Sequence, residues 1–233
     1  MKGATLLNKD EHEPTQALIK NYNADNEKYA HFLKLNDEKR ERILASAYDE
    51  FLEKGYGEAS TNIITQKAGI SKGLLFRYFG NKEGLYKFLM EESARRIADE
   101  ALSALPTKSG DVFAIIKSII QLKIAVCLQY PKETDFLIAA WAANLPENLL
   151  RQREKMMGMS YNYFDIICGL LDDSLLRDNI EKNVAAEIIA WVCEKYTDKV
   201  LSNGAVDTTS ESWNRVAEDL DKYMSALKSG LYK

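Results

Sequence analysis

Apolar residues recur at intervals of three or four positions along most of the chain, which is the period of an amphipathic α-helix. The first well-defined stripe consists of Ile43, Leu44, Ala47, Tyr48, Phe51 and Leu52. Asp37 is a candidate N-cap for this helix, and Gly55 is a candidate end because glycine readily adopts positive φ. No segment of useful length alternates apolar and polar residues as a strand would, so the pattern predicts an all-α protein.

Two short helices are predicted next, separated by a tight turn. Ser60 is a candidate N-cap for a helix over residues 61–68, and Ser71 is a candidate N-cap for a helix that runs through Phe79. Gly69 lies in the interval of about three or four residues between these helices, where a left-handed residue is needed. Helix, glycine-containing turn and helix in this order are typical of a helix-turn-helix.

A longer helix follows, capped by Asn81 and spanning about residues 82–105. At 1.5 Å per residue it is roughly 35 Å long, enough to join two domains. Beyond Pro106 the pattern predicts five further helices, over about residues 111–129, 132–144, 146–171, 181–202 and from 209 or 210 to near the end.

These elements divide the chain into three parts. Residues 1–28 are an N-terminal extension, either disordered or one short helix; residues 29–84 form the helix-turn-helix domain; residues 85–233 form a larger helical domain. The length of 233 residues fits one or two domains. With 46% hydrophobic and 28% charged residues, the composition excludes long disorder, collagen-like repeats and a disulfide-stapled miniprotein.

The cysteines and the hydropathy point to the cytoplasm. Cys127, Cys168 and Cys193 are widely spaced, match no zinc site and are expected to be core thiols in a reducing compartment. The polar N-terminus lacks the apolar core of a signal peptide, and no run of about 18 apolar residues is found. We therefore expect a cytoplasmic protein without a membrane partner.

The charge is distributed unevenly. The 31 basic and 35 acidic residues give a net charge of −4, which excludes a uniformly basic nucleic-acid coat. The stretch from Ser60 to Lys82 nevertheless holds no Asp or Glu, and its only ionised side chains are the cations Lys67, Lys72, Arg77 and Lys82. A local charge of +4 in an acidic protein suits binding to a polyanion.

The helix after Ser71 has a face suited to reading bases. Steps of 100° per residue place Leu75 and Phe79 on a buried face, with Gly73, Leu74 and Arg77 opposite. The flanks carry Lys72, Phe76 and Tyr78. In a major groove, Gly73 allows close approach, Leu74 and Phe76 can contact thymine methyls, and Lys72 can reach a guanine edge. The alternative is a three-helix packing module with a solvated basic face.

The stretch from Lys39 to Leu89, above all AGISKGLLFRYFGNKEGLY from Ala68 to Tyr86, resembles the N-terminal domain of the TetR (tetracycline-repressor-like) family of bacterial transcription regulators. The resemblance implies an all-α fold with a three-helix DNA-binding domain and a larger ligand-binding and dimerising body. Leu74 departs from the Thr or small polar residue frequent at its position, and the 28-residue leader is longer than usual.

The resemblance also assigns roles to residues of the helix-turn-helix. Ser60 and Thr61 match phosphate-contacting hydroxyls, and Tyr78 and Lys82 match contacts to the DNA backbone. The complete predicted DNA-binding set is Ser60, Thr61, Ser71, Lys72, Gly73, Leu74, Phe76, Arg77, Tyr78 and Lys82.

In the larger domain the resemblance implies a ligand pocket. Candidate lining residues are the sulfur-containing and aromatic side chains Cys127, Tyr130, Phe136, Trp141, Met156, Met157, Tyr161, Tyr163, Phe164 and Cys168. Such side chains form adaptable apolar cavities, so the expected effector is an apolar or amphipathic small molecule. Lys123 and Arg151 are candidate partners for an anionic group. The alternatives are plain core for the apolar residues and a solvated surface for the two cations.

The last two predicted helices carry more apolar surface than one small body needs. The predicted dimer interface consists of Ile188, Trp191, Val192, Tyr196, Trp213, Val216, Leu220, Tyr223 and Met224. Two copies would pack these helices in a four-helix seam around a two-fold axis. Ordinary packing within one chain is the alternative.

These features predict a dimeric DNA-binding repressor that binds a pseudo-palindromic operator and is released by a small-molecule ligand, without a metal or cofactor. An enzyme is not expected, because the only histidines are His12 and His31 and the sequence has no His/Cys/Asp cluster, phosphate-cradling glycine loop or serine elbow. The alternative is a helical binding or scaffold protein without specific DNA readout.

Overall fold

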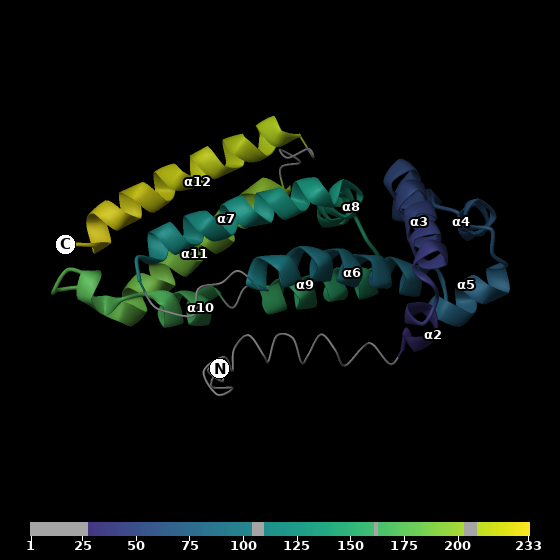
Figure 1. Ribbon diagram of the computed structural model, residues 1–233, viewed down its shortest axis with the longest axis horizontal. Coiled ribbons are helices and arrows are strands. Elements are labelled where there is room, and N and C mark those ends of the chain that lie inside the picture. Colours follow the sequence, from purple (N-terminus) through teal and green to yellow (C-terminus); the bar gives the residue numbers. More distant parts are fainter. Residues whose placement is uncertain (1–27, 104–109, 161–162, 203–208) are drawn as a thin grey trace, which may run out of the picture.

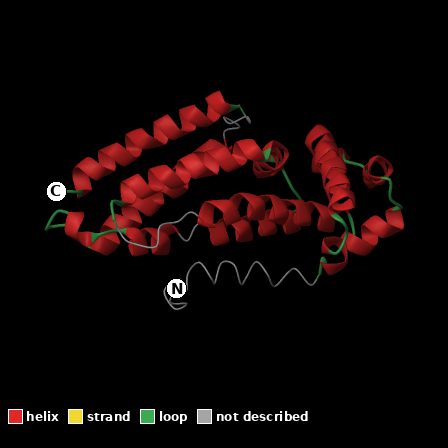
Figure 2. Cartoon of the chain, viewed as in Figure 1, coloured by secondary structure: helices red, strands yellow, loops and turns green. Residues whose placement is uncertain are grey.

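The computed structural model describes residues 28–103, 110–160, 163–202 and 209–233. The described residues form eleven α-helices and one 3₁₀ turn, with only two isolated β-bridges and no strand, which confirms the all-α prediction (Figure 2). The elements are α2 (Ala30–Leu33), α3 (Asp37–Glu58), α4 (Thr61–Ala68), α5 (Lys72–Phe79), α6 (Lys82–Ser103), α7 (Val112–Gln129), α8 (Pro131–Ala142), α9 (Glu147–Ser160), α10 (Tyr163–Leu170), η2 (Asp173–Leu175), α11 (Lys182–Ser202) and α12 (Ser210–Leu231). The predicted extension lies outside these residues, except for Lys28.

Most helix boundaries agree with the predictions, and the difference at the start of α3 is informative. The N-cap of α3 is Asn36, whose side chain accepts a hydrogen bond from the Lys39 N–H at 3.0 Å. The predicted cap, Asp37, instead lies in the first turn and pairs with Arg40 at 2.7 Å. Both residue types suit either place, because a carboxylate in the first turn also interacts favourably with the helix dipole.

The helix predicted over residues 146–171 corresponds to α9 and α10. Residues 161 and 162, between them, lie outside the described residues.

The buried side chains form two clusters at opposite ends of the molecule. One, the head-side cluster, combines α2–α5 with the first half of α6 and with α8 and α9. The other, the distal cluster, combines α7, α10, α11 and α12. We call α2–α5 the head and the remaining helices the body; α6 runs from the head into the body, beside α9 (Figure 1). The head thus shares its core with the adjoining half of the body.

α7 is the most apolar long helix of the body. By length and composition alone α7 could cross a membrane, although Lys117 and Lys123 interrupt its apolar residues. It packs against α6, α8 and α12. These contacts bury Val112, Phe113, Ile116, Val126 and Cys127, whereas the other apolar residues of α7 are partly or fully exposed.

The junction between α5 and α6 depends on a close backbone approach. Asn81 caps α6 as predicted, since its side chain accepts a hydrogen bond from the Gly84 N–H at 2.8 Å. A Cβ atom on Gly84 would lie 1.9 Å from the carbonyl oxygen of Phe79, well inside van der Waals contact. Only glycine therefore allows the first turn of α6 to meet the last turn of α5.

We predict that Gly84→Ala lowers the free energy of unfolding by about 1–3 kcal/mol, because the methyl group forces the two turns apart. Gly73→Ala is the matched control, since a Cβ there meets nothing within 4 Å. It should be neutral or stabilising by up to about 1 kcal/mol. Chemical denaturation followed by circular dichroism measures both variants, and equal stabilities would contradict the steric role of Gly84.

Candidate nucleic-acid interface

The turn between α4 and α5 has the predicted geometry. Gly69 ends α4 in the left-handed conformation, with φ 62° and ψ 39°. Ser71 then caps α5, and its hydroxyl accepts a hydrogen bond from the Leu74 N–H at 3.2 Å. The helix-turn-helix is thereby confirmed, and the N-terminal end of α5 is formed as the sequence predicts.

Two charged side chains of α3 hold α4, and sequence reasoning missed both. Arg42 donates through Nε to the Ala68 carbonyl at 2.9 Å, at the C-terminal end of α4. Glu50, which is buried, accepts a hydrogen bond from the Ser60 N–H at 3.0 Å. Ser60 itself makes no side-chain cap bond. A glutamate on the apolar face of an amphipathic helix was the available sign.

The faces of α5 largely match the prediction. Leu75 and Phe79 are buried. Ser71, Lys72, Gly73 and Arg77 are exposed, and Leu74 and Phe76 are half-buried against the head core. Lys72 Nζ lies 5.6 Å from the centroid of the Phe76 ring. The outward face of α5 therefore combines two cations with glycine and partly accessible apolar side chains.

Tyr78 differs from its predicted position on the flank. It is buried, and its ring centroid lies 5.7 Å from that of Phe32 in α2. Because Tyr78 follows Leu75 by three positions, the two side chains are only about 60° apart around the helix. The N-terminal helix α2 covers this part of α5, so the Tyr78 ring belongs to the core of the head.

Lys67 and Lys82, the first and last of the four cations between Ser60 and Lys82, have partners within the head. Lys82 Nζ donates to the carbonyls of Gly57 at 2.8 Å and Ala59 at 3.1 Å, and lies 4.9 Å from the Tyr56 ring centroid. Lys67 Nζ lies 3.7 Å from a carboxylate oxygen of Glu50. Lys82 thus closes the end of α3 in this structure, and its predicted contact to the DNA backbone stays a prediction.

Lys72 and Arg77 remain the outward charges of α5. Neither forms an ion pair within the described part of the chain, and both are exposed. Thr61 and Ser60 at the start of α4 are half-buried. The positive surface expected from the sequence therefore lies mainly on α5, with Lys67 sharing its charge with Glu50.

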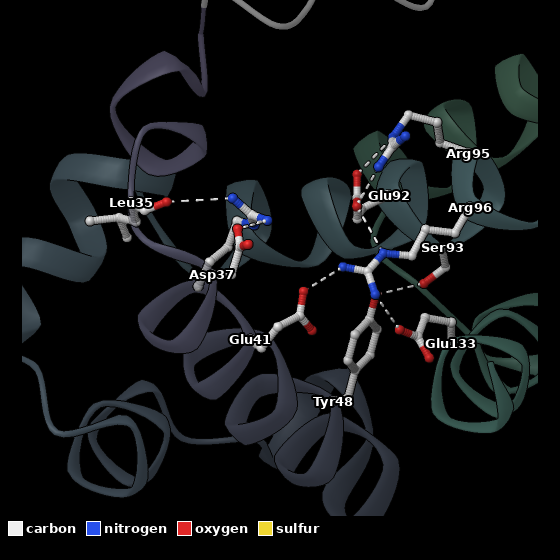
Figure 3. Close-up of polar contacts among 10 residues, drawn as sticks. Leu35, Asp37, Glu41, Tyr48, Glu92, Ser93, Arg95, Arg96 and Glu133 are labelled. Carbon is white, nitrogen blue, oxygen red and sulfur yellow. Dashed lines mark hydrogen bonds and ion pairs between the residues drawn. The ribbon is translucent and has the colours of Figure 1, made fainter. Parts of the chain in front are cut away.

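A half-buried arginine joins the head to the body. The guanidinium of Arg96 on α6 donates to Glu92 at 2.9 Å, to Glu133 of α8 at 3.0 Å and to Glu41 of α3 at 2.9 Å (Figure 3). Beside it, the hydroxyls of Tyr48 and Ser93 share a hydrogen bond of 2.8 Å between α3 and α6. We call Arg96 with Glu41, Glu92 and Glu133 the Arg96 junction.

The charges of this junction reinforce one another. Burial alone would raise the pKa of Glu92, but hydrogen bonds from Arg95 and Arg96 outweigh it and lower that pKa below its usual range. Because the pKa of Glu92 is lower in the folded chain than in the unfolded chain, its ionised form stabilises the fold at pH values above the ordinary pKa of a glutamate. This stabilisation is lost as the pH falls through the lowered pKa. At neutral pH Glu92 is therefore ionised and retains Arg96.

The predicted pocket residues are divided between the two clusters. Phe136 and Met156 lie in the head-side cluster, where the Phe136 ring packs 4.9 Å from that of Tyr86. Cys127 is buried, Cys168 packs at the distal cluster, and Phe164 is 38% exposed. Tyr130 and Trp141 are half-buried.

Tyr161 and the side chains of Met157 and Tyr163 lie outside the described residues. The structure thus does not gather the predicted set around one site. Among the described residues, no group of three His, Cys, Asp or Glu side chains could hold a metal ion.

The predicted interface residues differ in how deeply they are buried. Tyr196, Leu220 and Met224 are buried in the distal cluster, and Val192, Val216, Trp213 and Ile188 are half-buried. Trp191 is 57% exposed and Tyr223 is 45% exposed. Only Trp191 and Tyr223, together with the half-buried residues, offer apolar surface that a second copy of the chain could cover.

Comparison with known proteins matches residues 43–88 to the sequence profile described as bacterial regulatory proteins, tetR family. The transcriptional regulator RutR of Escherichia coli K12 is 33% identical over 110 residues, which cover 46% of this chain. The aligned part is 50% of RutR, so the chain spans about half the length of this curated relative.

Two longer alignments extend into the body. The fatty acid metabolism regulator protein of Bacillus subtilis 168 is 22% identical over 181 residues, covering 71% of this chain and 91% of that protein. The solved structure of the fatty acid degradation regulator FadR from Bacillus halodurans superposes with a TM-score of 0.59 at 17% identity, covering 82% of this chain and 96% of FadR. This likeness shows that the body shares its fold with such regulators.

Proposed function

We propose that this chain, which belongs to the TetR family of bacterial regulatory proteins, is a cytoplasmic transcriptional repressor that binds a pseudo-palindromic DNA operator as a homodimer. The observation that carries the proposal is the outward face of α5, where Lys72 and Arg77 stand exposed beside Gly73. A two-turn helix that buries one side and presents cations, glycine and apolar groups on the other fits a major groove.

Each part of the head then has a role on DNA. Lys72 reaches a guanine edge, Leu74 and Phe76 contact thymine methyls, and Gly73 allows the helix to approach the bases. Ser60, Thr61 and the free amides at the start of α4 bind phosphates, which fix the register of the head on the duplex. Arg42 and Glu50 hold α4 in place for these contacts.

We predict that Lys72→Ala and Phe76→Ala each cost about 1–3 kcal/mol of discrimination between the operator and a duplex mismatched at the contacted base. The operator is first selected from a pool of random duplexes, and fluorescence anisotropy then measures Kd. With the two outward cations Lys72 and Arg77 of each subunit placed against the DNA, log K should fall with log salt at a slope near −4 (about 0.9 × 4).

Arg151→Ala is the matched control, because it removes one exposed positive charge from α9 in the body. It should leave both discrimination and salt slope unchanged. Equal loss of affinity for all duplexes in Lys72→Ala and Phe76→Ala would contradict base reading by α5. Failure of the wild-type chain to select any duplex at low salt would favour a helical scaffold protein.

The proposed dimer rests on an apolar row along α11. Val184 is 46% exposed, Ile188 is half-buried and Trp191 is 57% exposed. Spacings of four and three residues place all three on one side of the helix. Tyr223 of α12 is 45% exposed. A second copy would cover this row in a two-fold interface, in which an aromatic anchor such as Trp191 contributes strongly.

We predict that Trp191→Arg converts the dimer into a monomer in sedimentation velocity and weakens operator binding, because two heads are no longer held together. Ile63→Arg is the control, since Ile63 is 38% exposed but lies on α4 in the head. It should sediment like the wild type. A Trp191→Arg protein that remains dimeric would contradict the α11 interface.

The proposed effector is an amphipathic molecule held in the body. Ile115, Ile119 and Leu122 of α7 are only half-buried although α7 packs against three other helices. This apolar surface suits an alkyl chain. Lys123 is a half-buried cation on the same helix, and we propose that it pairs with an anionic head group of the effector.

The Arg96 junction offers a route from effector to DNA. α6 extends from the head into the body, and Arg96 ties it to α3 through Glu41. A ligand that displaces α6 would therefore shift the head. Release from the operator requires that the ligand bind the displaced arrangement more tightly than the DNA-bound one.

We predict that Glu41→Gln reduces the effect of the ligand on operator Kd several-fold while changing the ligand-free Kd by less than about twofold. Arg96 keeps Glu92 and Glu133 in this variant, so the buried charges remain paired. Glu38→Gln, on the same helix with an 89% exposed side chain, is the control.

Dodecanoate is the probe, chosen because of the Bacillus subtilis fatty acid metabolism regulator, and dodecanol tests the need for an anionic head. If dodecanoate changes the operator Kd by the same factor in Glu41→Gln, Glu38→Gln and the wild type, coupling through Glu41 is contradicted. An operator Kd that neither probe changes in the wild type would contradict the proposed ligand class.

A further inference from the structure

The orientation of α5 cannot come from the helix itself. α5 has only eight residues, and a helix of two turns is unstable alone in water. Its position is set by what its inner face, Leu75, Tyr78 and Phe79, packs against. The groups that touch this face therefore decide how the outer face meets a groove.

Aromatic rings from a segment before the matched family region cover much of this face. The ring centroid of Phe32 in α2 lies 4.8 Å from that of Phe79 and 5.7 Å from that of Tyr78. Tyr29, just before α2, lies 6.2 Å from Phe79. Phe32 is fully buried and Tyr29 is 4% exposed. Phe88 of α6 supplies the third ring on Phe79, at 5.2 Å.

α2 is itself anchored to two other helices. The rings of Tyr29 and Phe32 lie 4.6 Å and 5.1 Å from that of Phe88 on α6. At its other end, Arg40 of α3 donates to the Leu35 carbonyl at 3.5 Å, and Asn36 caps α3. The segment Tyr29–Asn36 thus connects α3, α5 and α6, and it lies outside the matched residues 43–88.

We propose that α2 is a positioning element for base reading: Phe32, supported by Tyr29, sets the tilt of α5 without touching DNA itself. The inference rests on the proposed function of α5 as the base-reading helix. It assigns a role in sequence discrimination to an N-terminal segment that the helix-turn-helix does not include.

The proposal predicts different effects on discrimination between DNA sequences and on overall affinity for DNA. The phosphate contacts proposed for Ser60 and Thr61 lie on α4, which Arg42 and Glu50 hold from α3. α2 has no part in those hydrogen bonds. A change at Phe32 should therefore disturb contacts to bases, which need the correct tilt of α5, more than contacts to phosphates.

The test compares Phe32→Leu and Phe32→Ala with Leu33→Ala. Leu33 is the matched control because it lies on the same helix, is 36% exposed and is also apolar. Phe32→Leu keeps an apolar side chain and should fold. We expect the ratio of Kd for a mismatched duplex to Kd for the selected operator to fall at least about fivefold in Phe32→Leu, and further in Phe32→Ala. Leu33→Ala should keep the wild-type ratio.

Two further readouts distinguish positioning from loss of fold. In Phe32→Leu, amide hydrogen exchange should accelerate in α5 and remain unchanged in α11, and the salt slope should stay at the wild-type value. An unchanged Kd ratio in Phe32→Leu, or equal losses on operator and mismatched duplex, would overturn the proposal. A wild-type chain that prefers no duplex would instead overturn the proposed function, whereas the exchange rates would still decide whether α2 holds α5.

Discussion

The head depends on the packing of one short helix against an aromatic core. Phe79 at the end of α5 contacts rings from α2 and α6, and Leu75 and Tyr78 complete the buried face. Because α5 is too short to be stable alone, this packing supplies its stability and fixes its direction. It also leaves Lys72 and Arg77 on the outside. Burial of one face and presentation of the other are therefore two consequences of the same contacts.

The same constraint explains why the head is not an independent module. Its core continues into α6, α8 and α9, where Phe136 packs between α3 and α6 side chains. Polar contacts repeat this connection at the Arg96 junction, in which one guanidinium pairs with carboxylates of three helices. Of these groups Glu133 is buried and Arg96 is half-buried, so separating them would leave a charge with little access to water. A head joined in this way moves with α6.

Much of the head follows from the sequence because its determinants are local. Gly69 and Ser71 specify a left-handed turn and a cap within three residues, and the period of α5 identifies Leu75 and Phe79 as buried. The positions of Tyr78 and Lys82 could not be predicted in this way. They depend on Phe32 and on the carbonyl of Gly57, which are 46 and 25 residues away in the sequence. Residue type also fails to distinguish a pocket-lining residue from a core residue. Phe136 is suited to either role, and only its packing neighbours show that it belongs to the head-side cluster.

The most direct test is to find which part of the chain touches bases. A photo-crosslinking residue, p-benzoylphenylalanine, is placed at Leu74 on α5 and, separately, at Val184 on α11, and each protein is irradiated with the selected operator. We predict crosslinks from position 74 to bases at one site in each half of the operator, the two sites lying about one helical turn or a multiple of it apart. Position 184 should give none. Crosslinks from position 184 but not from position 74 would contradict the claim that α5 reads the DNA.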